Sequence, residues 1–199
     1  MKIIKYIFLS LLVVSTLTSC KKWIETDDAK INPNAAVDAP ASAILTHILT
    51  AAIQVNEGNS ARYTNMFTQH FRGIGRQHDG YDSYILSSQA FGWGVEYQEI
   101  IHQANIIIEK AAVAKDKALS GIAKVTKAWT FGTLTSLYGD IPFTEADKFE
   151  TVKNPKFDDQ VTVVYPGILA LLDEAIADLG AGGAVPGDVY FTADAGQAA

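Results

Sequence analysis

The sequence predicts an all-α fold in which helical hairpins stack side by side. Apolar residues recur at spacings of three and four in five segments of the chain, which is the period of an amphipathic helix. Glycine and proline residues, which end or interrupt helices, separate these segments. Two consecutive long segments, 95–114 and 119–138, look like one tetratricopeptide-style hairpin, although the sequence has no strict repeat of that kind.

The N-terminal residues 1–19 predict an export signal rather than part of this fold. Lys2 and Lys5 accompany an apolar run at 6–14, which is shorter than the about 20 residues that cross a bilayer core. Small polar residues then precede Cys20, in an order that looks like the bacterial lipobox. We therefore expect cleavage before Cys20 and a lipid on its thiol that tethers the protein stably to a membrane. The alternative is an ordinary signal peptide with a cysteine nearby.

The rest of the chain is expected to form a tether at 20–37 and one helical domain at 38–199. The tether segment is polar and shows neither a helical nor a strand period. The formal net charge of −6 argues against nucleic-acid binding, which requires clustered basic residues. Because Cys20 is the single cysteine, no intrachain disulfide can form.

We expect the first helix to begin near Pro40 with Asp38 as its N-cap, because proline tolerates the first helical turn. Its apolar face consists of Leu45, Ile48, Leu49, Ala52 and Val55. Residues 56–60, which include a glycine, are expected to end it. A second amphipathic stretch then covers 61–74 and is expected to stop at the glycines 73 and 75.

The third and fourth helices are expected at 95–114 and 119–138. The third has a wide apolar stripe, which indicates burial on two sides. Gly139 suits the left-handed position after the fourth helix, Asp140 is suited to local backbone hydrogen bonds, and Pro142 prevents continuation. We therefore expect this glycine–aspartate–proline turn to be structural rather than a binding site.

The fifth helix is expected after Asp158 or Asp159, either of which can cap it. Its apolar period is regular up to the glycine-rich stretch 180–183. Pro166 interrupts the pattern early, so the helix either starts near Tyr165 or is kinked in its first turns.

The segment 76–94 is the candidate binding surface. It is rich in glycine and polar residues but contains four aromatic side chains within thirteen residues. Sugars bind to flat aromatic faces with amide, guanidinium or carboxylate groups around them, and loops commonly carry such groups. The candidate ligand contacts are Arg76, Tyr81, Tyr84 and Trp93, with Asp82 and Gln89 supplying further polar groups. The alternative is that Tyr81 and Trp93 pack the loop onto the third helix.

Other patterns give no expectation of a metal, a cofactor or catalysis. The histidines lack paired metal-ligand spacing, and the sequence has no nucleophile, phosphate-loop or dinucleotide-binding motif. Glu96 and Glu99 lie three residues apart on one helix and are expected to be solvated. Asn105 lies on an apolar face, where we expect a buried amide bonded to backbone groups.

Three motifs that occur in order carry a family resemblance. The first consists of Tyr97, Ile100, Ala104, Asn105 and Ile108. The second consists of Ala128, Trp129, residues 137–143, Glu145 and Ala146. The third consists of Pro155, Phe157, Asp158, Gln160, Val164, Tyr165, Ile168, Leu172, Ala175 and Ile176. Behind a lipobox, this ordered set resembles the SusD/RagB-like nutrient-binding lipoproteins of Bacteroidetes.

The resemblance implies a superhelix with tetratricopeptide-like repeats, an outer-membrane lipoprotein exposed at the cell surface, and a SusC-like TonB-dependent transporter as its partner. It further implies binding of an oligosaccharide or peptide without catalysis. Family members are longer than this chain, and residues 188–191 resemble a family segment just before the chain stops, so we expect a C-terminally truncated domain. The competing functions are a helical-repeat scaffold lipoprotein that binds only proteins and, with less support, a surface hydrolase.

Overall fold

The structure is a computed structural model that describes residues 38–85 and 92–190. The chain divides into two compact units, Met1–Ala39 and Pro40–Ala199, and the fold below is that of the second unit. The expected signal, the tether and Cys20 lie outside the described residues, as do Gln89 and Phe91. Every regular element of the described ranges is a helix, which confirms the predicted all-α class.

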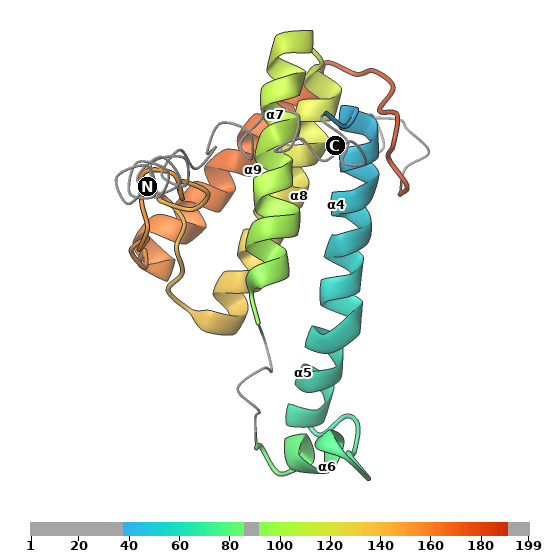
Figure 1. The fold of residues 1–199 in the computed structure, drawn as a ribbon, viewed down its shortest axis with the longest axis vertical. Helices are drawn as coiled ribbons and strands as arrows, with labels where there is room; N and C mark the ends of the chain where they lie inside the picture. The colour runs from blue at the N-terminus through green and yellow to red at the C-terminus, as the bar shows by residue number, and fades with distance from the viewer. Residues whose placement is uncertain (1–37, 86–91, 191–199) are drawn as a thin grey trace, which may run out of the picture. The chain divides into compact units, whose positions relative to one another are not determined.

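The first helical rod is longer than the sequence indicated (Figure 1). Helix α4, Ala41–Val55, passes through a wider π-helical turn, η1 (Asn56–Ser60), into α5, Ala61–Phe67. The prediction that residues 56–60 end the helix is wrong, because Gly58 takes a non-helical conformation (φ −88°, ψ −108°) that kinks the chain without stopping it. The predicted cap is also wrong, since Pro40 holds the N-cap position and no side chain caps the helix.

The next three elements form the predicted hairpin. The π-helical turn η2 (Glu96–Ile101) continues into α7, His102–Ala114, and α8 (Lys117–Tyr138) runs back along it. Lys115 adopts the left-handed conformation (φ 58°) that closes α7. Asp116 then caps α8, because its carboxylate accepts a hydrogen bond of 3.0 Å from the N–H of Leu119.

The last helix packs closely on α8. It begins as η3 (Gln160–Val164) and continues as α9, Tyr165–Leu179, with Pro166 tolerated in its first turn. Of the two predicted caps, Asp159 is the one used, since its carboxylate accepts hydrogen bonds from the N–H groups of Val161 and Thr162. The close approach depends on Gly121, where an added Cβ would lie 2.6 Å from Cγ of Leu179.

Length and composition would let one helical segment of the described ranges, Gln160–Leu179, cross a membrane. Most of the same segment is not buried in the structure, but Val164, Ile168, Ala175 and Leu179 are. They contribute to a core between α8 and α9, so length and hydropathy alone are weak evidence for a membrane span here.

The turn after α8 is structural, as expected, but it is held by distant contacts. Gly139 has a positive φ of 75°, as predicted. The predicted local backbone bonds of Asp140 are wrong, because its carboxylate accepts from the N–H of Gln160 at 2.9 Å. Ile141 and Asp158 form an isolated antiparallel bridge, so the turn is attached to the start of the next helix.

The core beside this turn brings together η2, α8 and α9. Its buried members are Ile101, Ala128, Phe131, Leu134, Ile141, Val164 and Ile168. The Tyr97 hydroxyl reaches over it and donates a 2.7 Å hydrogen bond to the carbonyl of Pro142. Residues of all three family-like motifs therefore meet in this core.

Candidate ligand-binding site

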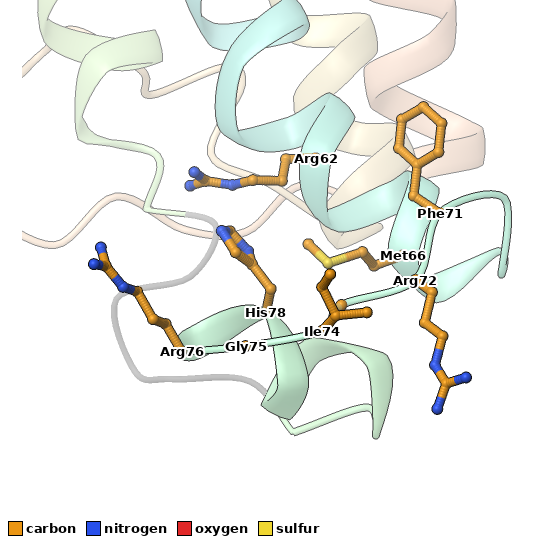
Figure 2. A pocket seen from close by; sticks show the side chains of 9 residues that line it. Arg62, Met66, Phe71, Arg72, Ile74, Gly75, Arg76 and His78 are labelled. Carbon is orange, nitrogen blue, oxygen red and sulfur yellow. The ribbon is translucent and has the colours of Figure 1, made fainter.

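A cavity of about 440 Å³ lies at the end of α5, beside the short helix α6 (Gln77–Asp82). Figure 2 shows that its lining comes from α5, from the loop after it and from α6. The lining residues are Arg62, Met66, Phe71, Arg72, Gly73, Ile74, Gly75, Arg76 and His78. Its volume falls within the range of small-molecule sites, roughly 300–1,000 Å³.

The loop reaches this position because α5 ends early, at Phe67 rather than at the predicted residue 74. Gln69 and Arg76 both adopt positive φ angles, 59° and 56°, which turn the chain back toward α6. Gly73 then lies so close to the carbonyl of His78 that an added Cβ would be 1.8 Å from its oxygen. Its N–H donates a hydrogen bond of 3.2 Å to the carboxylate of Asp82.

Two buried nitrogen atoms at the cavity have no hydrogen-bond partner. One is Nε of Arg62, whose Nη2 donates to the side-chain oxygen of Asn59 and whose guanidinium lies 5.3 Å from the ring centre of Tyr63. The other is Nδ1 of His78, whose ring packs at 6.0 Å against Tyr81. Since buried polar atoms are normally bonded, each is a position where a ligand atom could bind.

The remaining two arginines differ in their surroundings. Nε of Arg72 lies 3.8 Å from the carboxylate of Asp82, and its side chain is 83% exposed. Arg76 lines the cavity next to α6 and is exposed. In the view of Figure 2, the nitrogen-bearing ends of Arg62, Arg76 and His78 point to the same side, whereas Arg72 points away from them.

The structure brings three of the four candidate contacts to this end of the fold. Arg76 lines the cavity, and Tyr81 is buried, with 5% of its surface exposed and its ring centre 4.7 Å from that of Tyr63. Tyr84 is 63% exposed, and its ring stacks on Phe67 at 5.8 Å. Tyr84 therefore presents aromatic surface to solvent, while Tyr81 supports α6 against α5.

Trp93, the fourth candidate, lies elsewhere. It is partly buried beside the core of η2 and α8, with its ring centre 6.0 Å from Tyr97, 5.0 Å from Tyr138 and 5.8 Å from Phe157. Of these aromatic side chains, Phe157 is 60% exposed and faces solvent. Trp93 is therefore not placed at the cavity with Arg76.

A second, smaller cavity of about 190 Å³ lies beside the η1 turn. Glu96 borders it with 4% of its surface exposed, and its Oε2 has no hydrogen-bond partner. Burial raises the pKa of this carboxyl. The expectation that Glu96 is solvated is therefore wrong, whereas Glu99 is half-exposed and lies 3.0 Å from His47. Glu96, Ile100 and Ala104 follow one another at intervals of four residues and so share one helix face. Because Ile100 and Ala104 are apolar and buried, this spacing could have indicated that Glu96 is buried as well.

Apart from the two cavities, a cluster of polar side chains joins α7, α8 and the loop after α8. Asp147 accepts a 2.6 Å hydrogen bond from the amide of Asn105 and lies 2.6 Å from Nδ1 of His102. Lys127 donates to the Asn105 side-chain oxygen at 2.7 Å, and burial lowers the pKa of that lysine. The expectation for Asn105 is therefore wrong in two respects, since its amide is only partly buried and it bonds side chains rather than backbone groups.

Sequence reasoning singled out Arg76 but missed Arg62 and His78. Arg62 belongs to an amphipathic stretch, where an arginine usually marks the solvated face. A signal was nevertheless present, because all three arginines of the chain, Arg62, Arg72 and Arg76, fall within fifteen residues. Among the described residues, no group of three or more metal-ligating side chains is found.

Comparison with known proteins gives one family. The model of the SusD-like family, described as starch-binding and associating with the outer membrane, matches residues 33–197. No curated protein matches the chain.

Two solved structures are similar in fold. One is a SusD/RagB family protein from Bacteroides thetaiotaomicron VPI-5482, with 25% identity over 71% of this chain and a TM-score of 0.61. The other is a SusD homolog from Bacteroides fragilis NCTC 9343, with 23% identity over 80% of this chain and a TM-score of 0.64. The chain spans about a third of their length, 31% and 32% respectively. On the strength of the family match over residues 33–197, the chain belongs to the SusD-like family.

Proposed function

We propose that this protein is an outer-membrane lipoprotein that binds an oligosaccharide at the cell surface and delivers it to a SusC-like TonB-dependent transporter. The observation that carries the proposal is the open cavity of about 440 Å³ at the end of α5, in a chain that belongs to a family described as starch-binding. The mechanism is binding without bond cleavage. The ligand rests on the protein surface until the transporter receives it.

The chemistry of the cavity suits a sugar. Apolar side chains such as Met66 offer surface to the C–H groups of a pyranose ring, and the guanidinium of Arg76 can donate to its hydroxyls. The exposed ring of Tyr84 stacks on Phe67, which follows Met66 directly in the chain, and extends the aromatic surface available beside the cavity. In this proposal Arg76 and Tyr84 contact ligand, whereas Tyr81 supports the site from behind.

Calorimetric titration of the purified full chain with a panel of neutral and acidic oligosaccharides tests this proposal. We expect saturable binding to at least one saccharide, and a loss of about two- to tenfold in affinity on Tyr84→Ala, because an aromatic contact contributes roughly 0.5–1.5 kcal/mol. Tyr165→Ala, at an exposed tyrosine of α9, is the matched control and should bind as the parent does. Absence of binding to every saccharide, with normal helical circular dichroism, would refute the proposal.

The anchor and the transporter are tested separately in cells. In the proposal, residues 1–19 are removed, Cys20 carries the lipid and 20–37 spaces the domain from the membrane. Cys20→Ala should abolish incorporation of labelled palmitate and shift the protein from the membrane fraction to the soluble fraction. The parent should co-purify with a TonB-dependent transporter. Palmitate labelling of the variant, or a parent that never associates with a transporter, would count against these parts of the proposal.

A second candidate function is a scaffold lipoprotein that binds only protein partners. The observation that favours it is a row of exposed apolar side chains on one face of the last helix, consisting of Val161, Tyr165, Leu169 and Ile176. This candidate predicts stable protein complexes together with no affinity for any saccharide. The calorimetric panel therefore separates the two functions directly.

A further inference from the structure

All three arginines of the chain line a single cavity. The other 13 basic residues of the 16 are lysines, and none of those that the structure describes lines it. Arginine presents planar N–H pairs that match a carboxylate, which a lysine ammonium does not. The protein has a formal net charge of −6, so this local concentration of three positively charged guanidinium groups contrasts with its overall negative charge.

From this arrangement we infer that the cavity binds a carboxylate-bearing sugar, so that the preferred ligand is an acidic oligosaccharide built from uronic acid residues. The inference rests on the proposed function and names the substrate class of the same site. It concerns the group that Arg62, Arg76 and His78 hold, not the rest of the ligand.

The hydrogen-bonding state of the cavity supports an oxygen-rich anionic ligand. Nε of Arg62 always carries a hydrogen, yet it is buried and has no acceptor in the structure. Nδ1 of His78 is buried and unbonded as well, and it donates in the tautomer that carries the proton there. An ionised carboxylate has about four acceptor sites and no donor, so it suits the Nε–H of Arg62 and, in that tautomer, the Nδ1–H of His78.

The charge balance around the cavity points the same way. Among the residues that the structure describes, the cavity lining includes no aspartate or glutamate. Asp82 lies near the loop, but its carboxylate is engaged by the N–H of Gly73 and by Arg72. Neither Arg62 nor Arg76 has a carboxylate within ion-pair distance among the described residues. The guanidinium of Arg76 and the unbonded Nε of Arg62 therefore remain without a carboxylate partner.

The apolar part of the lining distinguishes a sugar acid from a small inorganic anion. Phe71 and Ile74 line the cavity and are 65% and 90% exposed, so they offer apolar surface that a free anion would leave in water. A pyranose ring can cover such surface with its C–H groups while its carboxylate meets the arginines. A cavity of about 440 Å³ holds a ring of this size.

The test compares two ligands that share the sugar ring and differ at the carboxyl group. The full chain, purified in detergent, is titrated calorimetrically with an oligogalacturonate and with its methyl ester, which keeps the ring but removes the negative charge. We expect the acid to bind at least about tenfold more tightly than the ester, because hydrogen bonds between charged groups are stronger than neutral ones. Equal affinities would overturn the inference while leaving the proposed function intact.

Charge-neutral variants show whether the preference arises in this cavity. Arg76→Gln and Arg62→Gln should each weaken binding of the acid by about tenfold and leave binding of the ester nearly unchanged. Lys153→Gln removes one positive charge from an exposed loop and is the matched control, which should change neither affinity. Because Arg76 is exposed, its variant should fold even if the Arg62 variant does not. An equal effect of the Arg76 and Lys153 variants would overturn the inference, and so would tight binding of acidic peptides with no binding of either sugar.

Discussion

Among single residues, the buried carboxyl of Glu96 is expected to have a clear effect on how the stability of the fold depends on pH. Burial raises its pKa above the ordinary glutamate value, so the folded state binds this proton more tightly than the unfolded chain. Its contribution to stability is therefore complete below the unfolded pKa of about 4.3 and is lost as pH rises through the raised value. At neutral pH the buried charge, with Oε2 unbonded, destabilises the fold.

The substitution Glu96→Gln should accordingly stabilise the protein at pH 7–8 and have little effect on its stability near pH 4. We expect a gain of about 1 kcal/mol in the free energy of unfolding at neutral pH, or a rise of about 2–4 °C in Tm. Thermal unfolding followed by circular dichroism between pH 4 and 8 measures the difference. A variant that is less stable than the parent at pH 8 would show that the carboxylate has a stabilising partner.

Asp158 behaves in the opposite way. Burial opposes its ionisation, but the N–H groups of Phe143 and Thr144, the Thr144 hydroxyl and Lys156 outweigh that effect and hold the pKa of Asp158 below its ordinary value. Its contribution is thus present above the unfolded pKa and is lost as pH falls through the lowered one.

We expect Asp158→Asn to destabilise the fold by about 2 kcal/mol at pH 7, because hydrogen bonds to a charged acceptor are replaced by weaker ones and Lys156 loses its partner. The free energy from urea unfolding should fall accordingly. The control is Asp173→Asn on the exposed surface of α9, which should change stability by less than about 0.5 kcal/mol. Equal effects of the two substitutions would refute a structural role for Asp158.

At the scale of helices, the contact between α8 and α9 depends on one glycine. An added Cβ at Gly121 would lie 2.6 Å from Cγ of the buried Leu179 and 3.2 Å from the carbonyl oxygen of Ala175. Gly132 lies in the same helix, and an added Cβ there would meet nothing within 4 Å. The two positions therefore separate helix propensity from packing.

Gly121→Ala should destabilise the protein by about 1–3 kcal/mol, because the two helices must move apart. Gly132→Ala should instead stabilise it by about 0.5–1 kcal/mol, because alanine favours the helix and no clash opposes it. Urea denaturation of both variants measures the contrast. Stabilisation of the protein by Gly121→Ala would contradict the close contact described here.

Sequence patterns predicted the helices well where local chemistry decides the outcome. The hairpin of α7 and α8 and the cap by Asp159 depend on apolar period and on neighbouring residues. The sequence did not reveal that the helix continues beyond Gly58, because a glycine permits a kink but does not decide whether the helix stops there. The contacts of Asp140 and Asn105 were missed because their partners lie 20 and 42 residues away.

The candidate site could be predicted only in part. The aromatic and polar composition of the segment 76–94 predicts a binding surface, and Arg76 does line the cavity. Composition could not tell the buried Tyr81 from the exposed Tyr84, since both have the same chemistry and lie three residues apart. Arg62 was missed because it reaches the cavity from a helix earlier in the chain.

For the molecule as a whole, the proposed ligand site lies at the end of α5 and α6, while α8 and α9 hold the helical framework. This division follows from where the cavity and the unbonded nitrogen atoms lie, and from the packing of α9 on α8. It concerns a chain that spans about a third of the length of its solved relatives.

Hydrogen–deuterium exchange of the full chain, with and without a saturating oligosaccharide, tests this division between site and framework. We expect ligand to slow amide exchange in peptides covering residues 59–84 and to leave exchange in Tyr165–Leu179 unchanged. Slowing confined to Tyr165–Leu179, with no change at residues 59–84, would contradict it.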